Sequence, residues 1–260
     1  MAAPKRVLCR ELPRIGKEIP LSPAESNHLI SVLRLQNGDQ VEAMDGKGQS
    51  VLATLRIRSK EAFLAYIQGQ EAKRANQGSG NQAEVLPIHL ELAILKGDAF
   101  EWVIEKAVEM GVSRLTPLET AHTVVQISKK GPEAFRDRWQ KIADQALKQC
   151  GRLTAMQIDL PVRLENHVTA SGKENRLIAM EDQRNEARFL LDQLGSWTAS
   201  EMGPGKEVRI LIGPEGGWSA SERALLPAHG TLISLGPVVF RAETAALFSA
   251  SLAAGWLRCS

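Results

Sequence analysis

The stretch LIGPEGGWSASE, residues 211–222, joins an apolar run to the start of a helix through three glycines and a proline. The preceding residues, VRILIG (208–213), are apolar enough for a buried strand, and Ser219 and Glu222 have the spacing of a capping box. In open α/β sheets, ligands bind beyond the carboxyl ends of strands, where glycine lets the backbone approach closely. The stretch therefore predicts a strand, a turn and a helix beside a small-molecule pocket.

The turn lacks the patterns of the common phosphate-binding loops. No Gly-Lys-Ser/Thr follows it, so it is not a P-loop, and it has no G-x-G-x-x-G pattern of a dinucleotide-binding fold. A single glycine-rich turn is also commonly just a tight loop. The interpretation therefore depends on which other segments the fold places beside it.

A second stretch, SLGPVVFRAETAALFSASLAAGWLR (234–258), repeats the order of strand, Gly-Pro turn and helix. It adds Arg241 and Glu243 at the turn. The helix that follows is apolar and rich in small residues almost all round, which predicts burial in the core or against a second subunit.

Strands and helices alternate from residue 88 onward. The run IHLELAIL (88–95) alternates as a strand, and a helix with one apolar stripe follows, with Asp98 as its N-cap and Gly111 at its end. Another helix is expected over 134–151, and further strands at 114–118, 177–180, 208–213 and 232–236. Apolar strands separated by helices predict a mostly parallel sheet that is covered on both faces.

Residues 1–70 predict a separate, β-rich domain. Two strands are expected around the Asp45-Gly46 turn, and AFLAYI (62–67) continues as a third. The following segment, 71–87, is rich in Gly, Gln, Asn and Ser and predicts a linker to a second domain over 88–260. Residues 1–80 hold 12 lysines and arginines against 8 acids, so positive charge is concentrated in the first third.

The composition excludes several classes of protein. The net charge of +2 is too small to indicate a nucleic-acid partner without clustering. The three cysteines, Cys9, Cys150 and Cys259, have no ligand-like spacing, so neither a metal site nor a disulfide framework is expected. The chain offers no signal peptide and no apolar run of about eighteen residues that would span a membrane. We therefore expect a cytoplasmic protein.

IGPEGGWSASE followed by LGPVVFRAETAAL resembles the paired cofactor loops of the SPOUT methyltransferases. Within them, the chain is similar to the RsmE family, which methylates N3 of a uridine in 16S ribosomal RNA. Residues 28–39 resemble that family's N-terminal PUA-like RNA-binding domain, 94–118 its first strand-helix-strand unit, and 138–152 its next helix. Four segments in the family's order are far more specific than one glycine-rich turn.

The resemblance implies an α/β fold with a deep C-terminal trefoil knot and a small N-terminal PUA-like β-barrel. It also implies S-adenosylmethionine (SAM) as the cofactor, no metal, a homodimer, and 16S rRNA or the small ribosomal subunit as the partner. Turns of Leu, Ile, Gly and Pro suit an adenine slot edged by backbone groups. The matching cofactor-binding residues are Met180, Ile212, Gly213, Pro214, Glu215, Gly216, Gly217, Leu235, Gly236, Pro237, Val238, Val239 and Phe240.

Methylation of an imide nitrogen requires loss of its proton. Arg241 is the candidate to stabilise negative charge on the uracil carbonyl oxygens, and Glu243 or Glu215 could accept the proton directly or through water. Alternatives stay open for both acids. Glu243 would also interact with a helix dipole, and Glu215 would also shape its loop by hydrogen bonds. Trp218, beside the glycine turn, is a candidate to line the cofactor slot.

The candidate RNA-binding residues lie in the matched segments or, for Arg6 and Arg10, near them in sequence. Arginines there would bind phosphates and position the RNA. Arg34 is the best placed in the matched motif, whereas His28 also has the ordinary interpretation of a packed residue. Arg152 either faces the target uridine or interacts with a helix end. The full set is Arg6, Arg10, His28, Arg34 and Arg152.

The sequence departs from the family at a few positions on the substrate side. Val238 stands where a basic residue is usual, His122 where arginine is common, and LTAMQI follows Arg152 in place of another Arg and a Pro. Two other functions stay open. One is an RNA-binding or ribosome-assembly protein without catalysis, and the other is a methyltransferase that acts on another nucleotide of ribosomal or transfer RNA.

Overall fold

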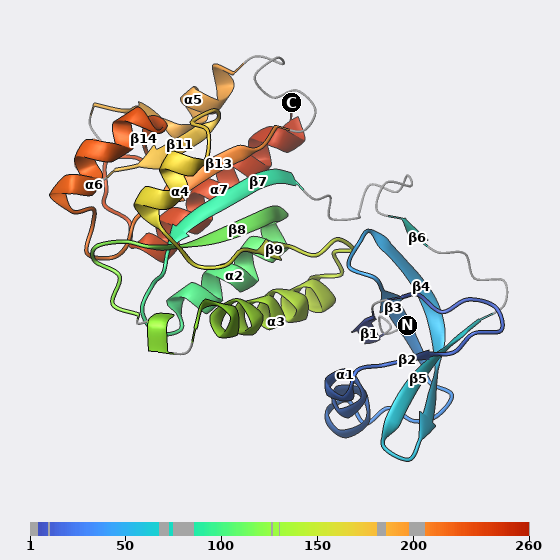
Figure 1. Cartoon of the computed structure of the whole chain (residues 1–260). Helices are drawn as coiled ribbons and strands as arrows, with labels where there is room; N and C mark the ends of the chain where they lie inside the picture. The colour runs from blue at the N-terminus through green and yellow to red at the C-terminus, as the bar shows by residue number, and fades with distance from the viewer. Residues whose placement is uncertain are drawn as a thin grey trace. The chain divides into compact units, whose positions relative to one another are not determined.

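The computed structural model describes residues 5–9, 11–67, 73–74, 86–125, 127–129, 131–180, 186–197 and 206–259 (Figure 1). The chain divides into two compact units. The first unit is Met1–Glu84 with Leu147–Ala155, and the second is Val85–Ala146 with Met156–Ser260. Most of the predicted linker, 71–87, lies outside the described residues.

The first unit is built on a six-stranded sheet with the order β1-β3-β4-β5-β2, and β6 pairs with β4. Its antiparallel core, β3 to β5, confirms the predicted strands around Asp45-Gly46 and over 62–67. Two short helices, α1 (Pro23–Asn27) and the π-helix η1 (His28–Val32), follow β2. The strands are β1 (Lys5–Leu8), β2 (Ile19–Pro20), β3 (Gln40–Met44), β4 (Gln49–Arg58), β5 (Glu61–Tyr66) and β6 (Lys73–Arg74).

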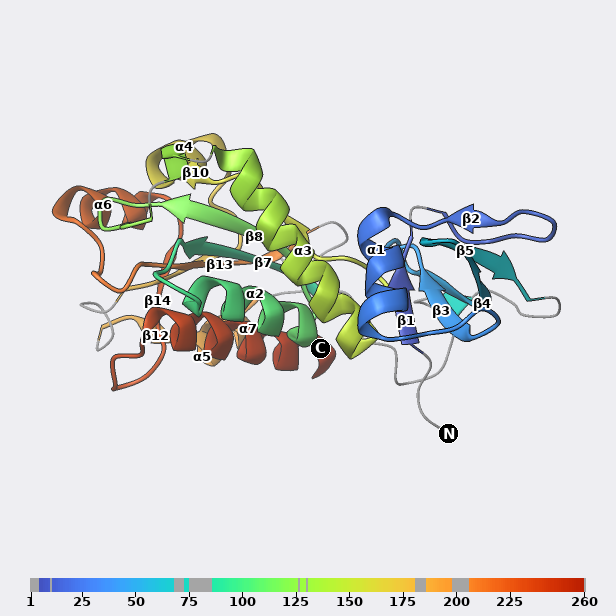
Figure 2. The ribbon, with the colours of Figure 1, turned by 90° about the horizontal axis from the view of Figure 1, so that it is seen from below.

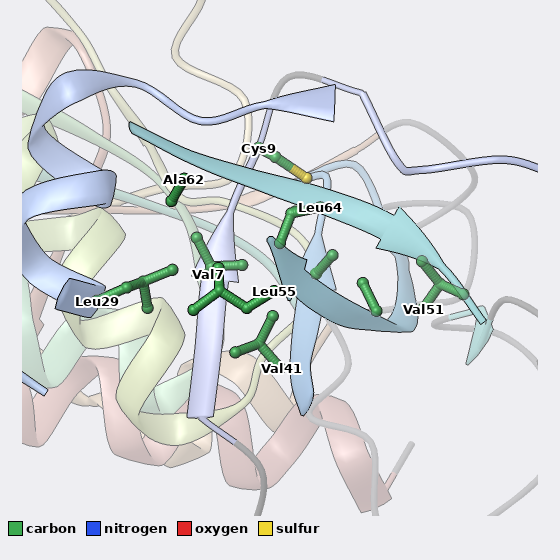
Figure 3. Packing of buried hydrophobic residues seen from close by; sticks show 10 residues of the cluster. Val7, Cys9, Leu29, Val41, Val51, Leu55, Ala62 and Leu64 are labelled. Atoms are coloured by element: carbon green, nitrogen blue, oxygen red, sulfur yellow. The ribbon is translucent and has the colours of Figure 1, made fainter. Parts of the chain in front are cut away.

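Side chains that alternate along these strands form the core of the first unit. Leu55 of β4 lies beside Val7 and Val41, and Leu64 of β5, Val51 and Leu29 belong to the same cluster of buried residues (Figure 3). Because successive strand residues point to opposite faces, the residues between them lie on the outer face of the sheet. The first unit therefore has one buried and one outward face along β4 and β5.

Residues 147–155 join the first unit although they follow the second unit's strands in sequence. Arg6 Nη1 donates to the carbonyl oxygens of Lys148 and Gln149, both at 3.0 Å. The backbone of Gly46 and Gly48 also bonds with residues 153–155. Sequence periodicity does not predict that 147–155 pack with the first unit, because these contacts join residues more than a hundred positions apart.

The second unit is built on an eight-stranded sheet with the order β10-β8-β7-β13-β11-β14-β12, and β9 pairs with β8. All of its described pairings are parallel, which confirms the predicted α/β class. The strands are β7 (Leu86–Ala93), β8 (Val112–Glu119), β9 (Gln157–Ile158), β10 (Val162–Arg163), β11 (Arg176–Ala179), β12 (Arg188–Phe189), β13 (Val208–Ile212) and β14 (Thr231–Ser234).

Helices cover both faces of this sheet (Figure 2). α2 (Ala99–Met110) and α7 (Ala242–Cys259) lie side by side on one face, while α4 (Leu164–Ala170) and α6 (Ala220–Leu225) lie on the other. The remaining helices are α3 (Pro132–Cys150), α5 (Leu190–Gly195) and the 3-10 turns η2 (Ile127–Lys129) and η4 (Leu226–Ala228). The short strands β9, β10 and β12 and the helices α4 and α5 were not predicted.

Two local predictions need correction. Asp98 is the N-cap residue of α2, as predicted, but its side chain makes no capping hydrogen bond, because its backbone is helical rather than extended. For α7, the alternative of complete burial in the core is wrong, since Thr244, Ser251 and Gly255 are exposed, and packing of this helix against a second subunit stays a prediction. The predicted end of α2 is confirmed, because Gly111 has a φ of +96°. The trefoil knot stays a prediction.

None of the described helices is both long and apolar enough to cross a membrane. The described residues also contain no cluster of three or more His, Cys, Asp and Glu side chains that could hold a metal ion.

Candidate active site

Three loops meet at one edge of the parallel sheet in the second unit. β11 pairs with β13 on one side and with β14 on the other, so their carboxyl ends lie together (Figure 1). The loops after β13 and β14 and the residue after β11 enclose a cavity of about 800 Å³. The cavity therefore lies where the glycine-rich turn predicts a pocket.

The cavity brings together nearly all the predicted cofactor-binding and catalytic residues. Met180, Ile212–Gly217, Leu235, Gly236 and Val238–Phe240 line it, as do Arg241 and Glu243. Pro237 is the one predicted cofactor residue that is not part of the lining. Sequence motifs alone missed or left open the other lining residues, which are Ala99, Ala179, Trp218, Arg223, Ile233, Ala242 and Ala245.

The first loop is a turn fixed by its own backbone and by its neighbours. Gly217 N donates to Pro214 O at 2.9 Å, and Gly217 has a φ of +68°, which favours glycine. Glu215 accepts from the backbone N of Lys96 at 3.0 Å. This contact supports the loop-shaping interpretation of Glu215 over a role as the proton acceptor.

A loop after β8 is also attached to the glycine turn. Glu222 is buried, makes the predicted capping box with Ser219, and accepts from Ala121 N at 2.8 Å. His122 Nδ1 lies 2.8 Å from Gly217 O. A β-carbon at Gly216 would come within 3.1 Å of His122 Cβ, so glycine permits this close approach. His122 stands where arginine is common in the family, and nothing local in the sequence predicts its contact with the glycine turn.

The second loop leads into the amino end of α7. Gly236 has a φ of +120°, and the rings of Phe240 and Phe248 lie 5.2 Å apart between centroids. Arg241 is exposed and Glu243 is half-buried, and both side chains lie at the cavity. The positive end of the helix dipole and the Arg241 guanidinium therefore both favour negative charge at this point.

The predicted RNA-binding residues do not form one surface. Arg6 pairs with Glu42 at 3.1 Å and also bonds the end of α3, and His28 is half-buried in η1. Arg152 is fully buried, which lowers its pKa to about 10, so its side chain is not presented to RNA. Arg34 is exposed, with a φ of +54°, and Arg10 lies outside the described residues. Arg34 remains the prediction that the structure leaves accessible.

Gly213 is expected to tolerate no side chain. A β-carbon there would lie 2.8 Å from Trp218 Cε2, and Trp218 is buried with its Nε1 3.3 Å from Ala179 O. Because Trp218 lines the cavity, Gly213→Ala would displace a wall of the site. We expect about ten-fold weaker binding of SAM, measured by isothermal titration calorimetry.

Gly195→Ala in α5 is the matched control, because a β-carbon at Gly195 meets nothing within 4 Å. This control is expected to bind SAM as the wild type does. Equal affinity for SAM in Gly213→Ala and Gly195→Ala would contradict the role assigned to the contact between Gly213 and Trp218.

Both units of the chain resemble known RNA methyltransferases. A family model described as an RNA methyltransferase domain matches residues 81–254, and another described as an RNA methyltransferase PUA domain matches 21–66. Ribosomal RNA small subunit methyltransferase E of Bacillus subtilis (strain 168) is 27% identical over 231 residues, which cover 87% of this chain and 86% of that protein.

Two solved structures resemble the chain over nearly its whole length. A Legionella pneumophila protein in complex with the bound cofactor SAM is 30% identical, with a TM-score of 0.80 and 97% of each chain covered. Ribosomal RNA small subunit methyltransferase E from Neisseria gonorrhoeae, bound to S-adenosyl methionine, is 25% identical, with a TM-score of 0.78 and 96% of each chain covered.

The fold, the cavity and these matches define an RNA methyltransferase with an N-terminal PUA domain, and the chain belongs to this family. Within the family, the resemblance to the RsmE type is confirmed by the relatives from Bacillus subtilis and Neisseria gonorrhoeae.

Proposed function

We propose that the chain transfers a methyl group from SAM to N3 of a uridine in 16S rRNA of the small ribosomal subunit. The observation that carries this proposal is the shared cavity, in which two glycine-containing loops meet Arg241 and Glu243. Its volume of about 800 Å³ is in the usual range for small-molecule sites. Apolar side chains such as Ile212, Leu235 and Phe240, together with glycine backbone, suit a nucleoside with an adenine ring.

The residues that would hold SAM are those of the two loops and Met180. When bound, SAM supplies an electrophilic sulfonium methyl group. The chain's own contribution begins with orientation, because a rigid cavity that aligns the acceptor nitrogen removes much of the entropic cost of reaction. Trp218, fixed by its bond to Ala179 O, and the hydrogen bond between Gly217 and Pro214 hold the glycine loop in shape for this task.

Charge and proton movement are assigned to the amino end of α7. When the uracil N3 proton leaves, negative charge spreads over N3 and the two carbonyl oxygens. Arg241 would hold this charge, since it is a permanent cation at the cavity. Glu243, in the first turn of α7, is the carboxylate placed to take the proton directly or through water.

The proposal includes a homodimer that works in the cytoplasm, as the family resemblance implies. Val238 and Val239 are 59% and 53% exposed at the cavity, so both apolar side chains are available to a second chain. The exposed face of α7 also carries small residues that permit close packing of another helix.

The decisive experiment is methyl transfer with a defined acceptor. Purified protein is incubated with methyl-labelled SAM and small ribosomal subunits that lack the modification, or with 16S rRNA alone. The RNA is then digested to nucleosides and analysed by mass spectrometry. We expect labelled 3-methyluridine from one site. Transfer RNA is offered as the acceptor in a parallel reaction. Label in another nucleoside, or in the transfer RNA only, would contradict the substrate assignment, and no label with no binding of SAM would contradict the enzyme assignment.

A further inference from the structure

A row of side chains crosses three strands on the outer face of the N-terminal sheet. Arg56 of β4 lies opposite Phe63 of β5, and Phe63 lies opposite Pro20 of β2. Residues directly opposite in antiparallel strands project from the same face. The alternating neighbours Leu55 and Leu64 point into the core instead (Figure 3). Arg56, Phe63 and Pro20 therefore form a continuous row on the face away from the core.

The aromatic ring in this row is paired with a second arginine. The guanidinium carbon of Arg58 lies 4.9 Å from the centroid of the Phe63 ring. Arg58 also bonds Glu18 at 2.6 Å, and its side chain is still 63% exposed. The cation–π contact and the ion pair hold the guanidinium plane in place at the surface. Phe63 is half-buried and Arg58 is exposed, so the pair forms a fixed stacking surface that solvent reaches mainly over the guanidinium.

Positive charge surrounds this stacking surface. Arg56 is exposed and makes no hydrogen bond or ion pair with a described residue, and Lys60 is exposed at the turn between β4 and β5. We name Pro20, Arg56, Arg58, Lys60 and Phe63 the Arg56–Phe63 face. Its three basic side chains outnumber the two acids beside it, which are Glu18 and Glu61.

An open sheet face with an aromatic ring, arginine planes and excess positive charge is suited to single-stranded RNA. Bases that are not paired stack on aromatic rings or guanidinium planes, and basic side chains bind the phosphates between them. The bases of duplex RNA are paired and stacked on one another, so a duplex would contact only the basic side chains of this face through its phosphates. The stacked Arg58 and Phe63 therefore favour a single strand as the occupant.

We propose that the Arg56–Phe63 face binds a single-stranded segment of the RNA substrate. One base stacks on the Arg58 and Phe63 pair, and neighbouring phosphates contact Arg56 and Lys60. This inference rests on the proposed function and extends it to residues outside the predicted set of Arg6, Arg10, His28, Arg34 and Arg152. It lies within the segment 21–66 that matches the PUA model, except for Pro20.

The first test is a charge reversal at Arg56. Fluorescence anisotropy with a labelled oligouridylate of about ten nucleotides is expected to show about ten-fold weaker binding for Arg56→Glu. The slope of log affinity against log salt is expected to fall by about 0.7, the value for one phosphate contact on a single strand. Lys5→Glu, at an exposed position of β1, is the matched control and is expected to keep wild-type affinity.

The second test separates stacking from charge. Phe63→Leu is expected to weaken oligouridylate binding about ten-fold, whereas Phe63→Tyr keeps the ring and is expected to restore it. Thermal unfolding of each variant checks that the first unit is folded. Wild-type affinity in both Arg56→Glu and Phe63→Leu would overturn the proposal, as would tighter binding of a duplex of the same length. If Phe63→Leu does not fold, Arg56→Glu decides alone.

Failure of this inference is distinguishable from failure of the proposed function. Binding of SAM and methyl transfer to 16S rRNA are measured on the wild type, independently of the oligouridylate. If the wild type methylates the RNA and Arg56→Glu binds the oligouridylate normally, only the inference is wrong. If the wild type transfers no methyl group but Arg56→Glu and Phe63→Leu lose affinity for the oligouridylate, the Arg56–Phe63 face binds RNA and the proposed methyl transfer is wrong.

Discussion

Arg241→Ala is expected to lower the rate of methyl transfer by about 100- to 1,000-fold, the usual effect of removing one preorganised donor from a developing anion. The guanidinium lies at the cavity, at the amino end of α7, and it can reach charge that forms only as the N3 proton leaves. Because SAM carries no such anion at the reacting centre, its affinity is expected to change little. The loss should therefore appear in kcat rather than in the Kd for SAM.

The measurement combines single-turnover methyl transfer with calorimetric binding of SAM. Arg258→Ala is the matched control, since Arg258 lies in the last turn of the same helix, is exposed and does not line the cavity. Arg241→Lys keeps a positive charge but loses the planar pair of donors, so we expect an intermediate rate. A rate for Arg241→Ala close to that of Arg258→Ala would remove Arg241 from the reaction.

The cofactor loops could be predicted because their information is local. A buried strand, a turn that needs glycine and a capped helix all lie within 208–222, and the second loop repeats this pattern before α7. Parallel strands bring their carboxyl ends to one edge, so two such loops on neighbouring strands share a pocket. The structure confirms the strands, the capping box and the shared cavity.

The roles of the basic residues could not be predicted from residue type. Arg6 and Arg152 have the charge that RNA requires, but Arg6 bonds the end of α3 and Arg152 is buried. What decides between a structural and a binding role is the return of 147–155 to the first unit, a contact between distant parts of the sequence. The Arg56–Phe63 face shows the converse, because its residues become neighbours only through strand register.

A buried charged cluster in the second unit is the other feature that periodicity misses. The strand 88–95 alternates, and this alternation does not tell where its polar positions His89 and Glu91 find partners. Both are buried instead, on the face of the sheet that α4 covers. Glu91 finds partners on α4, β11 and β13, which are far from it in sequence. Only the assembled sheet shows that the polar side chains of this strand belong to a buried network of hydrogen bonds and ion pairs.

Glu91→Gln is expected to lower the free energy of unfolding of the second unit by about 3–5 kcal/mol. Glu91 is fully buried and accepts from Arg176 Nε at 2.8 Å, Arg209 Nε at 2.9 Å and His167 Nε2 at 2.9 Å. Glutamine keeps the shape of the side chain but removes its charge. Arg176, which is also buried, and Arg209 would then lose the carboxylate that bonds both of them.

The same cluster predicts acid lability. Burial alone would raise the pKa of Glu91, but the hydrogen bond from His167 and the charges of Arg209 and Arg176 hold it far below its ordinary value of 4.5. A carboxyl group whose pKa is lower in the folded state stabilises the fold above the unfolded-state pKa. That contribution is lost as the pH falls from about 4.5 toward the folded-state pKa. The pKa of Asp159 is also lowered, so it adds to this loss in the same direction.

Urea unfolding followed by tryptophan fluorescence measures this effect, because all five tryptophans lie in the second unit and report on it alone. At pH 7 the free energies of unfolding of wild type and Glu91→Gln are expected to differ by the whole of the about 3–5 kcal/mol given above. Below about pH 4.5 this difference should narrow by up to about 1.4 kcal/mol per pH unit. In that range the wild type binds a proton at Glu91 when it unfolds, which favours its unfolded state, whereas glutamine does not titrate. Asp137→Asn, which breaks the exposed pair of Arg136 and Asp137, should change the free energy of unfolding little at either pH. A difference between wild type and Glu91→Gln that stays constant from pH 7 to below pH 4 would show that the Glu91 charge does not stabilise this sheet.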